Sequence, residues 1–177
     1  MVSPVASCTA CVNPYVSAFI ETLAIPRTTL IQAKQSENSL TLSASSGQSK
    51  TFDGASLKAL THKTVIFHNA HTNADETYSG VPLIYLLGTM GVPRGKDLHG
   101  KVLSEYVVAT GSDGYKAVLA LAEVDPEFHP GDVIVADTMD GQPLDEKNGP
   151  FKLVVTEDKR PARSVHNLVS IDVKTAE

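Results

Sequence analysis

The feature that most constrains the fold is a series of short, β-rich segments that fills the second half of the chain. Turn sequences such as SDGY, HPGD and DGQP separate the segments, and they supply the Gly, Pro and Asp residues that tight turns require. Because the segments do not alternate with full-length helices, they predict antiparallel or mixed sheets rather than a parallel βαβ arrangement. We expect strands at about residues 101–110, 115–121, 132–138, 151–156 and 168–174.

The first half of the chain adds a hairpin, one further strand and one clear helix. Alternating apolar residues and a Ser-Ser-Gly turn predict a hairpin over residues 39–53, followed by a short helix with Asp53 as its N-cap. A β-branched and aromatic run predicts a strand at 63–69, and the loop TNADET follows it. Apolar residues at helical spacing predict a helix over 82–90, and 121–126 contains one more helical turn. The expected fold class is therefore α+β, with a few short helices.

Chain length and charge restrict the domain count and the class of partner. The 177 residues, 42% of them hydrophobic, suffice for one core, so we expect an N-terminal segment at 1–35 and a single domain at 36–177. A net charge of -5 gives no broad basic face, which argues against nucleic acid and anionic membranes as partners. No apolar run reaches the roughly 18 residues that span a bilayer, so no direct membrane insertion is expected.

Both cysteines, Cys8 and Cys11, lie in the N-terminal segment as a C-x-x-C pair. This spacing suits a redox pair or half of a zinc site, but no second Cys pair completes either reading. A leader remnant or a local disulfide of an exported protein is the favoured alternative. The residues before Glu21 are uncharged and lack the basic residues of a secretory leader, so no signal peptide is readable.

The segment 158–167, DKRPARSVHN, concentrates basic residues after an apolar strand. Arg160 and Arg163 lie three positions apart, and guanidinium groups bind phosphate or carboxylate through paired hydrogen bonds. A loop that leaves a strand can add backbone N–H donors to such an anion site. The alternative is a solvated loop whose cations pair with neighbouring acidic residues such as Asp158.

Two further groups are candidates for ligand contact. In GSDGY, a tight turn presents Asp113 and Tyr115, and the phenol can donate a hydrogen bond or a proton to a substrate oxygen. The alternative is a hairpin turn with a half-buried tyrosine. His68 and His71 lie three apart on an extended segment and face opposite sides, so joint metal binding requires a turn between them. One of the two rings acting as a donor or acceptor in a pocket is the favoured interpretation.

Other templates are weaker or missing. The acidic residues from Asp137 to Glu146 lack the spacing of a calcium loop and are interpreted as a long ordered loop. The chain contains neither the G-x-S-x-G motif of serine nucleophiles nor the G-x-G-x-x-G dinucleotide motif.

Four segments, taken in order, resemble the molybdopterin-binding domain of the sulfite oxidase family, particularly its small stand-alone members. They are YSGVPLIYLLGTMGVP, YVVATGSDGYKAVLALAEVDP, VADTMDGQPLDEKNGPFKLVV and DKRPARSVHNLVSIDV, and the likeness runs from about Ser39 to Lys174. The resemblance implies a sulfite-oxidase-like α+β fold that holds a pterin or molybdopterin in a cleft. It also implies that basic residues of the ARSV segment bind the phosphate of that cofactor.

Residue by residue, the resemblance places Arg163, Ser164 and His166 on the stretch that contacts the cofactor. His166 stands where the enzymes usually have a Lys, and a shorter, partly charged imidazole implies weaker or pH-dependent attraction of phosphate. Tyr115 falls near the region that supplies an active-site tyrosine in the enzymes. With Arg160, Asp113, His68 and His71, these residues form the predicted ligand-binding set.

The position that corresponds to the molybdenum-binding Cys of the enzymes falls on His68. Without that thiolate the metal loses its soft anionic ligand, so bound molybdenum and standard sulfite oxidation are not expected. We therefore expect a non-catalytic pterin-binding module, an extracytoplasmic receptor that reports occupancy to a membrane-sensor partner. The alternatives are a molybdopterin-dependent oxidoreductase without the usual Cys ligand, and an interaction domain whose cleft has decayed. The resemblance to exported stand-alone members implies a periplasmic or secreted location.

Overall fold

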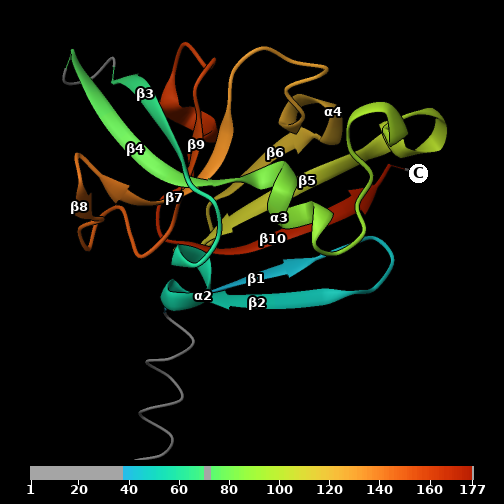
Figure 1. The fold of residues 1–177 in the computed structure, drawn as a ribbon, viewed down its shortest axis with the longest axis horizontal. Coiled ribbons are helices and arrows are strands. Elements are labelled where there is room, and N and C mark those ends of the chain that lie inside the picture. Colours follow the sequence, from blue (N-terminus) through green and yellow to red (C-terminus); the bar gives the residue numbers. More distant parts are fainter. Residues whose placement is uncertain (1–37, 70–72, 177) are drawn as a thin grey trace, which may run out of the picture.

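The structure is a computed structural model that describes residues 38–69 and 73–176. Two five-stranded sheets form the framework of the described chain (Figure 1). The predicted N-terminal segment with Cys8 and Cys11, and the predicted site residue His71, lie outside the described residues.

The first sheet, sheet A, is mixed. Its strand order is β2-β1-β10-β5-β6, and β1 pairs with β10 in parallel while the other neighbours are antiparallel. The strand that comes after all the others in the chain therefore lies in the middle of this sheet. The strands are β1 (Ser39–Ser43), β2 (Ser49–Asp53), β5 (Glu105–Gly111), β6 (Lys116–Ala120) and β10 (Leu168–Thr175).

The second sheet, sheet B, is antiparallel throughout. Its order is β3-β4-β7-β8, and β9 also pairs with β7. The β3–β4 hairpin extends away from sheet A at the upper left of Figure 1. The strands are β3 (Lys63–Asn69), β4 (Ala74–Pro82), β7 (Val133–Met139), β8 (Gln142–Pro143) and β9 (Lys152–Val155). The mixed and antiparallel pairing confirms the predicted fold class.

The helices are short, as predicted. Asp53 caps the first of them, accepting a hydrogen bond from the Ser56 backbone N–H at 2.7 Å. The α-helices are α2 (Gly54–Lys58), α3 (Leu83–Gly88) and α4 (Leu121–Val124), and the 3-10 helices are η1 (Gly95–Asp97), η2 (Gly100–Ser104) and η3 (Pro161–Arg163). None of the helices in the described part of the chain is long and apolar enough to cross a membrane.

The segment after β3 corrects the sequence prediction, which placed a loop at residues 72–77. Residues 74–82 form β4, which pairs with β3 on one edge and with β7 on the other. Gly80 on β4 lies so close to the β7 backbone that a Cβ would collide with Val135. Tertiary pairing therefore decides the conformation of this segment. The acidic stretch from Asp137 is likewise not one loop, since β7 continues through Asp137 to Met139 and turns into β8.

Two apolar clusters lie on opposite faces of β7. Val133 and Val135 point into the main core with the buried face of α3, whereas Ile134 and Ala136 point into a smaller cluster with Val65, Phe67 and Tyr78. Because β7 is covered on both faces, its sequence VIVA is apolar without alternation.

Candidate ligand-binding site

A pocket of about 240 Å³ lies where the β5–β6 turn meets the segment between β9 and β10. Four of the predicted site residues line it, together with Pro161 and Ala162: Asp113, Tyr115, Ser164 and His166. The structure thus brings together residues that lie about fifty positions apart in the chain.

Backbone contacts fix the β5–β6 turn against the far side of the pocket. The Ser112 N–H donates to the Asn167 carbonyl at 2.9 Å. A Cβ on Gly111 would lie 2.8 Å from the His166 carbonyl oxygen, so only glycine permits this approach. The turn and the His166 segment therefore hold a fixed separation.

Asp113 and Tyr115 form one wall of the pocket, and both are exposed to solvent. The Tyr115 hydroxyl donates to the Ala162 carbonyl at 2.6 Å, which ties the end of its side chain to η3. Asp113 Oδ1 accepts from the Tyr115 backbone N–H at 2.9 Å. The other carboxylate oxygen, Oδ2, makes no hydrogen bond with a described residue, so it can accept from a ligand.

Ser164 and His166 line the same pocket from the segment between β9 and β10. Ser164 is buried, and its hydroxyl oxygen accepts from the Val155 N–H at 3.3 Å, which ties the pocket to β9. His166 is exposed at the rim, but neighbouring atoms shield part of its ring. This desolvation, followed by the positive charge of Lys152, lowers the pKa of His166. At neutral pH its imidazole is therefore an uncharged donor and acceptor.

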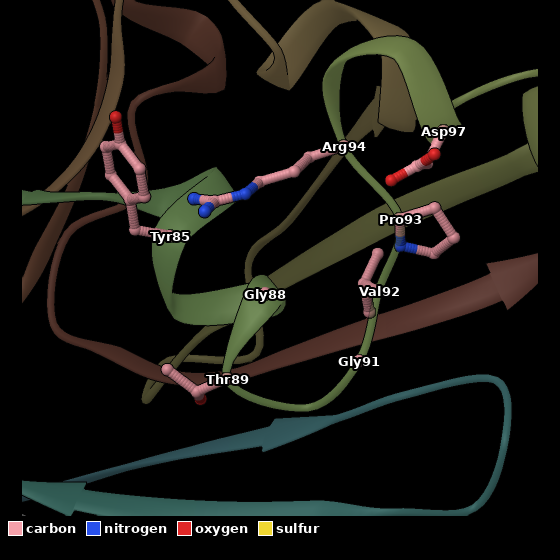
Figure 2. A pocket seen from close by; sticks show the side chains of 8 residues that line it. All are labelled: Tyr85, Gly88, Thr89, Gly91, Val92, Pro93, Arg94 and Asp97. Carbon is pink, nitrogen blue, oxygen red and sulfur yellow. The ribbon is translucent and has the colours of Figure 1, made fainter.

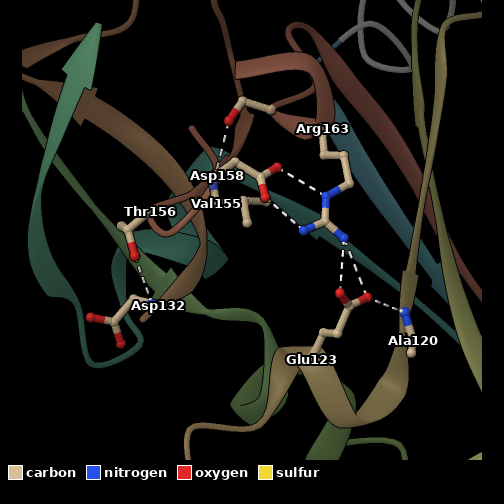
Figure 3. A network of polar contacts seen from close by, with 8 residues as sticks. Ala120, Glu123, Asp132, Val155, Thr156, Asp158 and Arg163 are labelled. Carbon is tan, nitrogen blue, oxygen red and sulfur yellow. Dashed lines mark hydrogen bonds and ion pairs between the residues drawn. The ribbon is translucent and has the colours of Figure 1, made fainter. Parts of the chain in front are cut away.

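Arg163 does not line the pocket, and its guanidinium points toward Asp158 and Glu123 (Figure 3). Its guanidinium donates to Asp158 through Nε at 2.9 Å and Nη2 at 2.6 Å, and to Glu123 through Nη1 at 3.1 Å. Hydrogen bonds from the guanidinium to Asp158, and then to Glu123, raise the pKa of Arg163. Two carboxylates thus neutralise Arg163, which the sequence analysis had predicted to bind a phosphate.

The other predicted contacts do not join the pocket. Arg160 is exposed, and its side chain makes no hydrogen bond or ion pair with any described residue. His68 lies on β3, where its Nδ1 bonds to Asp75 Oδ1 at 2.7 Å and the ring is largely exposed. Neither side chain lines the pocket that contains Tyr115.

Comparison with known proteins identifies the family. Residues 26–177 match the family model described as the oxidoreductase molybdopterin binding domain. The chain belongs to this family.

A solved structure supports the same fold for this molybdopterin-binding-type domain. The sulfane dehydrogenase SoxCD from Paracoccus pantotrophus is similar with a TM-score of 0.60 and 16% identity, over 81% of this chain and 40% of the SoxCD chain. The chain therefore spans less than half of that protein's length. No curated protein matches. The predicted sulfite-oxidase-like resemblance and fold are confirmed.

The pocket residues of this family member do not fit a phosphate-bearing molybdenum cofactor. Arg163 is neutralised by two carboxylates, the pKa of His166 is lowered, and the carboxylate of Asp113 lines the pocket. The pocket is also smaller than the roughly 300–1,000 Å³ of typical ligand sites. Within the described ranges, no three His, Cys, Asp or Glu side chains come together in a way that could hold a metal ion.

The sequence reasoning missed a buried polar cluster behind His166. Lys152, only 5% exposed, donates from Nζ to the Tyr78 hydroxyl at 2.6 Å and to Asn148 Oδ1 at 3.2 Å. Tyr78 in turn donates to Glu76 Oε2 at 2.7 Å. Burial lowers the pKa of Lys152 and, with the hydrogen bond to Glu76, raises that of Tyr78. The only signal was a lysine inside the apolar run FKLVV, which a buried cation with partners explains.

Proposed function

We propose that this domain is a non-catalytic module that binds a pterin ring in the pocket of Asp113, Tyr115, Ser164 and His166. The observation that carries the proposal is the free Oδ2 of Asp113 at a pocket wall that also presents a fixed tyrosine ring. A pterin carries adjacent N–H donors on its amino-pyrimidine edge, and a carboxylate is the acceptor that such a pair prefers.

The remaining pocket groups complement a flat, uncharged heterocycle. The Tyr115 ring offers an aromatic face for stacking, and its position is set by the hydrogen bond to Ala162. Neutral His166 can donate to or accept from a ring nitrogen or carbonyl. A bare pterin needs no phosphate-binding cation, which agrees with the engagement of Arg163 elsewhere.

The non-catalytic assignment rests on position 68. The resemblance places His68 where the enzymes have their metal-binding Cys. The His68 imidazole on β3 is bonded to Asp75 on β4, outside the pocket. A role as a periplasmic or secreted receptor with a membrane-sensor partner is part of the proposal. It rests on the resemblance to stand-alone family members, and fractionation of cells that express the tagged full-length gene tests the location.

Pterin fluorescence titration of the purified chain tests the binding role. We expect saturable quenching by pterin, and about tenfold weaker binding by Asp113→Asn, which keeps an oxygen to accept from Tyr115 but removes the charge. Arg160→Gln is the matched control on an exposed side chain and should bind as the wild type does. Absence of saturable binding, or equal affinity of D113N, contradicts the proposal.

Metal analysis of the protein as isolated separates the alternatives. Molybdenum at about one atom per chain would support the oxidoreductase that lacks the Cys ligand. A protein that binds neither pterin nor metal would favour the interaction domain with a decayed cleft.

A further inference from the structure

A second, larger cavity lies at the end of α3 and the loop that follows it. It has a volume of about 600 Å³, and Tyr85, Thr89, Arg94 and Asp97 line it (Figure 2). Two glycines, Gly88 and Gly91, leave its floor without side chains. It shares no lining residue with the pocket of Asp113 and Tyr115.

Arg94 extends across this cavity toward Tyr85 (Figure 2). Its guanidinium carbon lies 4.8 Å from the centroid of the Tyr85 ring, a cation–π contact. A Cβ at Gly88 would lie 3.9 Å from Arg94 Cδ, so the side chain packs over the glycine. These two contacts hold the guanidinium in one orientation although both Arg94 and Tyr85 are exposed.

The charge of Arg94 has no acidic partner among the described residues. Asp97 lines the same cavity, but no ion pair joins the two. Asp125, which lines the adjacent cavity, is buried and accepts from the backbone N–H groups of Gly95 at 2.6 Å and Glu127 at 2.9 Å. The edge of the guanidinium is therefore free to bind a carboxylate through two hydrogen bonds.

The neighbouring cavities indicate what else a ligand would carry. A cavity of about 400 Å³ shares Tyr85 and Thr89 with the first one. Its other lining residues are Leu60, Thr61 and Val81, which suit the apolar part of a ligand. Another cavity, of about 340 Å³, also borders Tyr85. Its lining has three acidic residues, Asp97, Asp125 and Glu127, and two basic residues, Arg94 and Lys96. These carboxylates disfavour a second negative charge, and so disfavour a phosphate dianion relative to a monoanion.

We infer that the cavity at Tyr85 and Arg94 binds small monocarboxylates with an apolar body. Arg94 holds the carboxylate, and the apolar part extends past Tyr85 toward Leu60 and Val81. The site is independent of the proposed pterin pocket, so either assignment can fail without the other.

Titration of the ¹⁵N-labelled full chain with 4-phenylbutyrate, followed by NMR, tests the inference. We expect saturable shifts of backbone amides in residues 84–97 and at Thr61, with a dissociation constant of about 1 mM for a ligand of this size. The neutral 4-phenylbutyramide and the variant Arg94→Gln should each weaken binding about tenfold. Arg160→Gln is the control that removes an exposed guanidinium elsewhere and should change nothing.

Several results would overturn the inference. These are the absence of saturable shifts, equal affinity for the amide, equal affinity of R94Q, or shifts confined to the Asp113–Tyr115 turn. Phenyl phosphate binding more tightly than phenylbutyrate would overturn the choice of a monocarboxylate. The spectrum of R94Q itself reports whether that variant folds; if it does not, Arg94→Lys, which keeps the charge and loses the paired geometry, should weaken binding severalfold, and unchanged affinity would overturn the inference.

Discussion

Arg163 and Arg94 carry the same side chain in opposite surroundings. Arg163 is bonded to Asp158 and Glu123, with N–O distances from 2.6 to 3.3 Å. Arg94 has an aromatic ring beneath it and no carboxylate partner in the described part of the chain. The first arginine connects two elements of the fold, η3 and α4, whereas the second presents its charge to an open cavity. A basic residue is thus available to an anionic ligand only where the fold has not already supplied the anion.

The largest expected effect is on stability at Arg163. Arg163→Met removes the cation and leaves Asp158 and Glu123 facing each other, so the free energy of unfolding should fall by about 2 kcal/mol. Urea denaturation at pH 7 measures it. Arg160→Met is the matched control and should stay within about 0.5 kcal/mol of wild type. If the two variants lose equal amounts, the Arg163 network has no structural role.

A smaller effect is expected on the free energy of unfolding at acidic pH. Burial alone would raise the pKa of Glu123, but hydrogen bonds from the Ala120 N–H and from Arg163 bring it below its ordinary value of 4.5. Because the folded pKa is the lower one, ionised Glu123 stabilises the protein above pH 4.5, and this is lost as pH falls through the folded pKa.

Glu123→Gln tests this dependence, since glutamine can still accept from the Ala120 N–H. The variant should be less stable at pH 7, by under about 1 kcal/mol because the side chain is a third exposed, and the difference should shrink at pH 3. Urea denaturation at both pH values measures the two differences. If the difference in free energy of unfolding between E123Q and the wild type is the same at pH 7 and pH 3, the charge of Glu123 is not its cause.

The smallest effect is expected at Arg94. A double-mutant cycle with Arg94→Gln and Tyr85→Leu should give a coupling of about 0.5 kcal/mol, typical of an exposed cation–π contact. Urea denaturation of the four proteins measures it. A coupling as large as the loss in R163M would mean that Arg94 also serves mainly to hold the fold, which would weaken the contrast between the two arginines.

Local patterns in the sequence predicted what is local in the structure. Turn chemistry located the β1–β2 and β5–β6 hairpins, and Asp53 was recognised as a helix cap from its neighbours alone. Strand β4 was not predicted, because the residues TNADET have the polar composition of a loop and the close approach of Gly80 to Val135 cannot be read from neighbouring residues. That approach depends on pairing with β7, more than fifty residues further along the chain.

The candidate site was predicted only in part, because contacts between residues far apart in the chain cannot be read from local patterns. Asp113, Tyr115, Ser164 and His166 were recognised as candidates and line one pocket. The sequence interpretation in which loop cations pair with nearby acids included Asp158, which does bind Arg163. Glu123 could not be foreseen, because it lies forty positions away. The Lys152–Tyr78 contact likewise depends on β4 and β9 flanking the same strand.

The central place of β10 in sheet A has a consequence for synthesis on the ribosome. The β1–β2 and β5–β6 hairpins emerge from the exit tunnel first, and each presents an open edge to whatever is nearby. Only when β10 follows can it join them, in parallel with β1 and antiparallel with β5. Protease resistance of stalled nascent chains should therefore appear in one step, after Thr175 has cleared the tunnel, and a gradual rise would contradict this order of assembly.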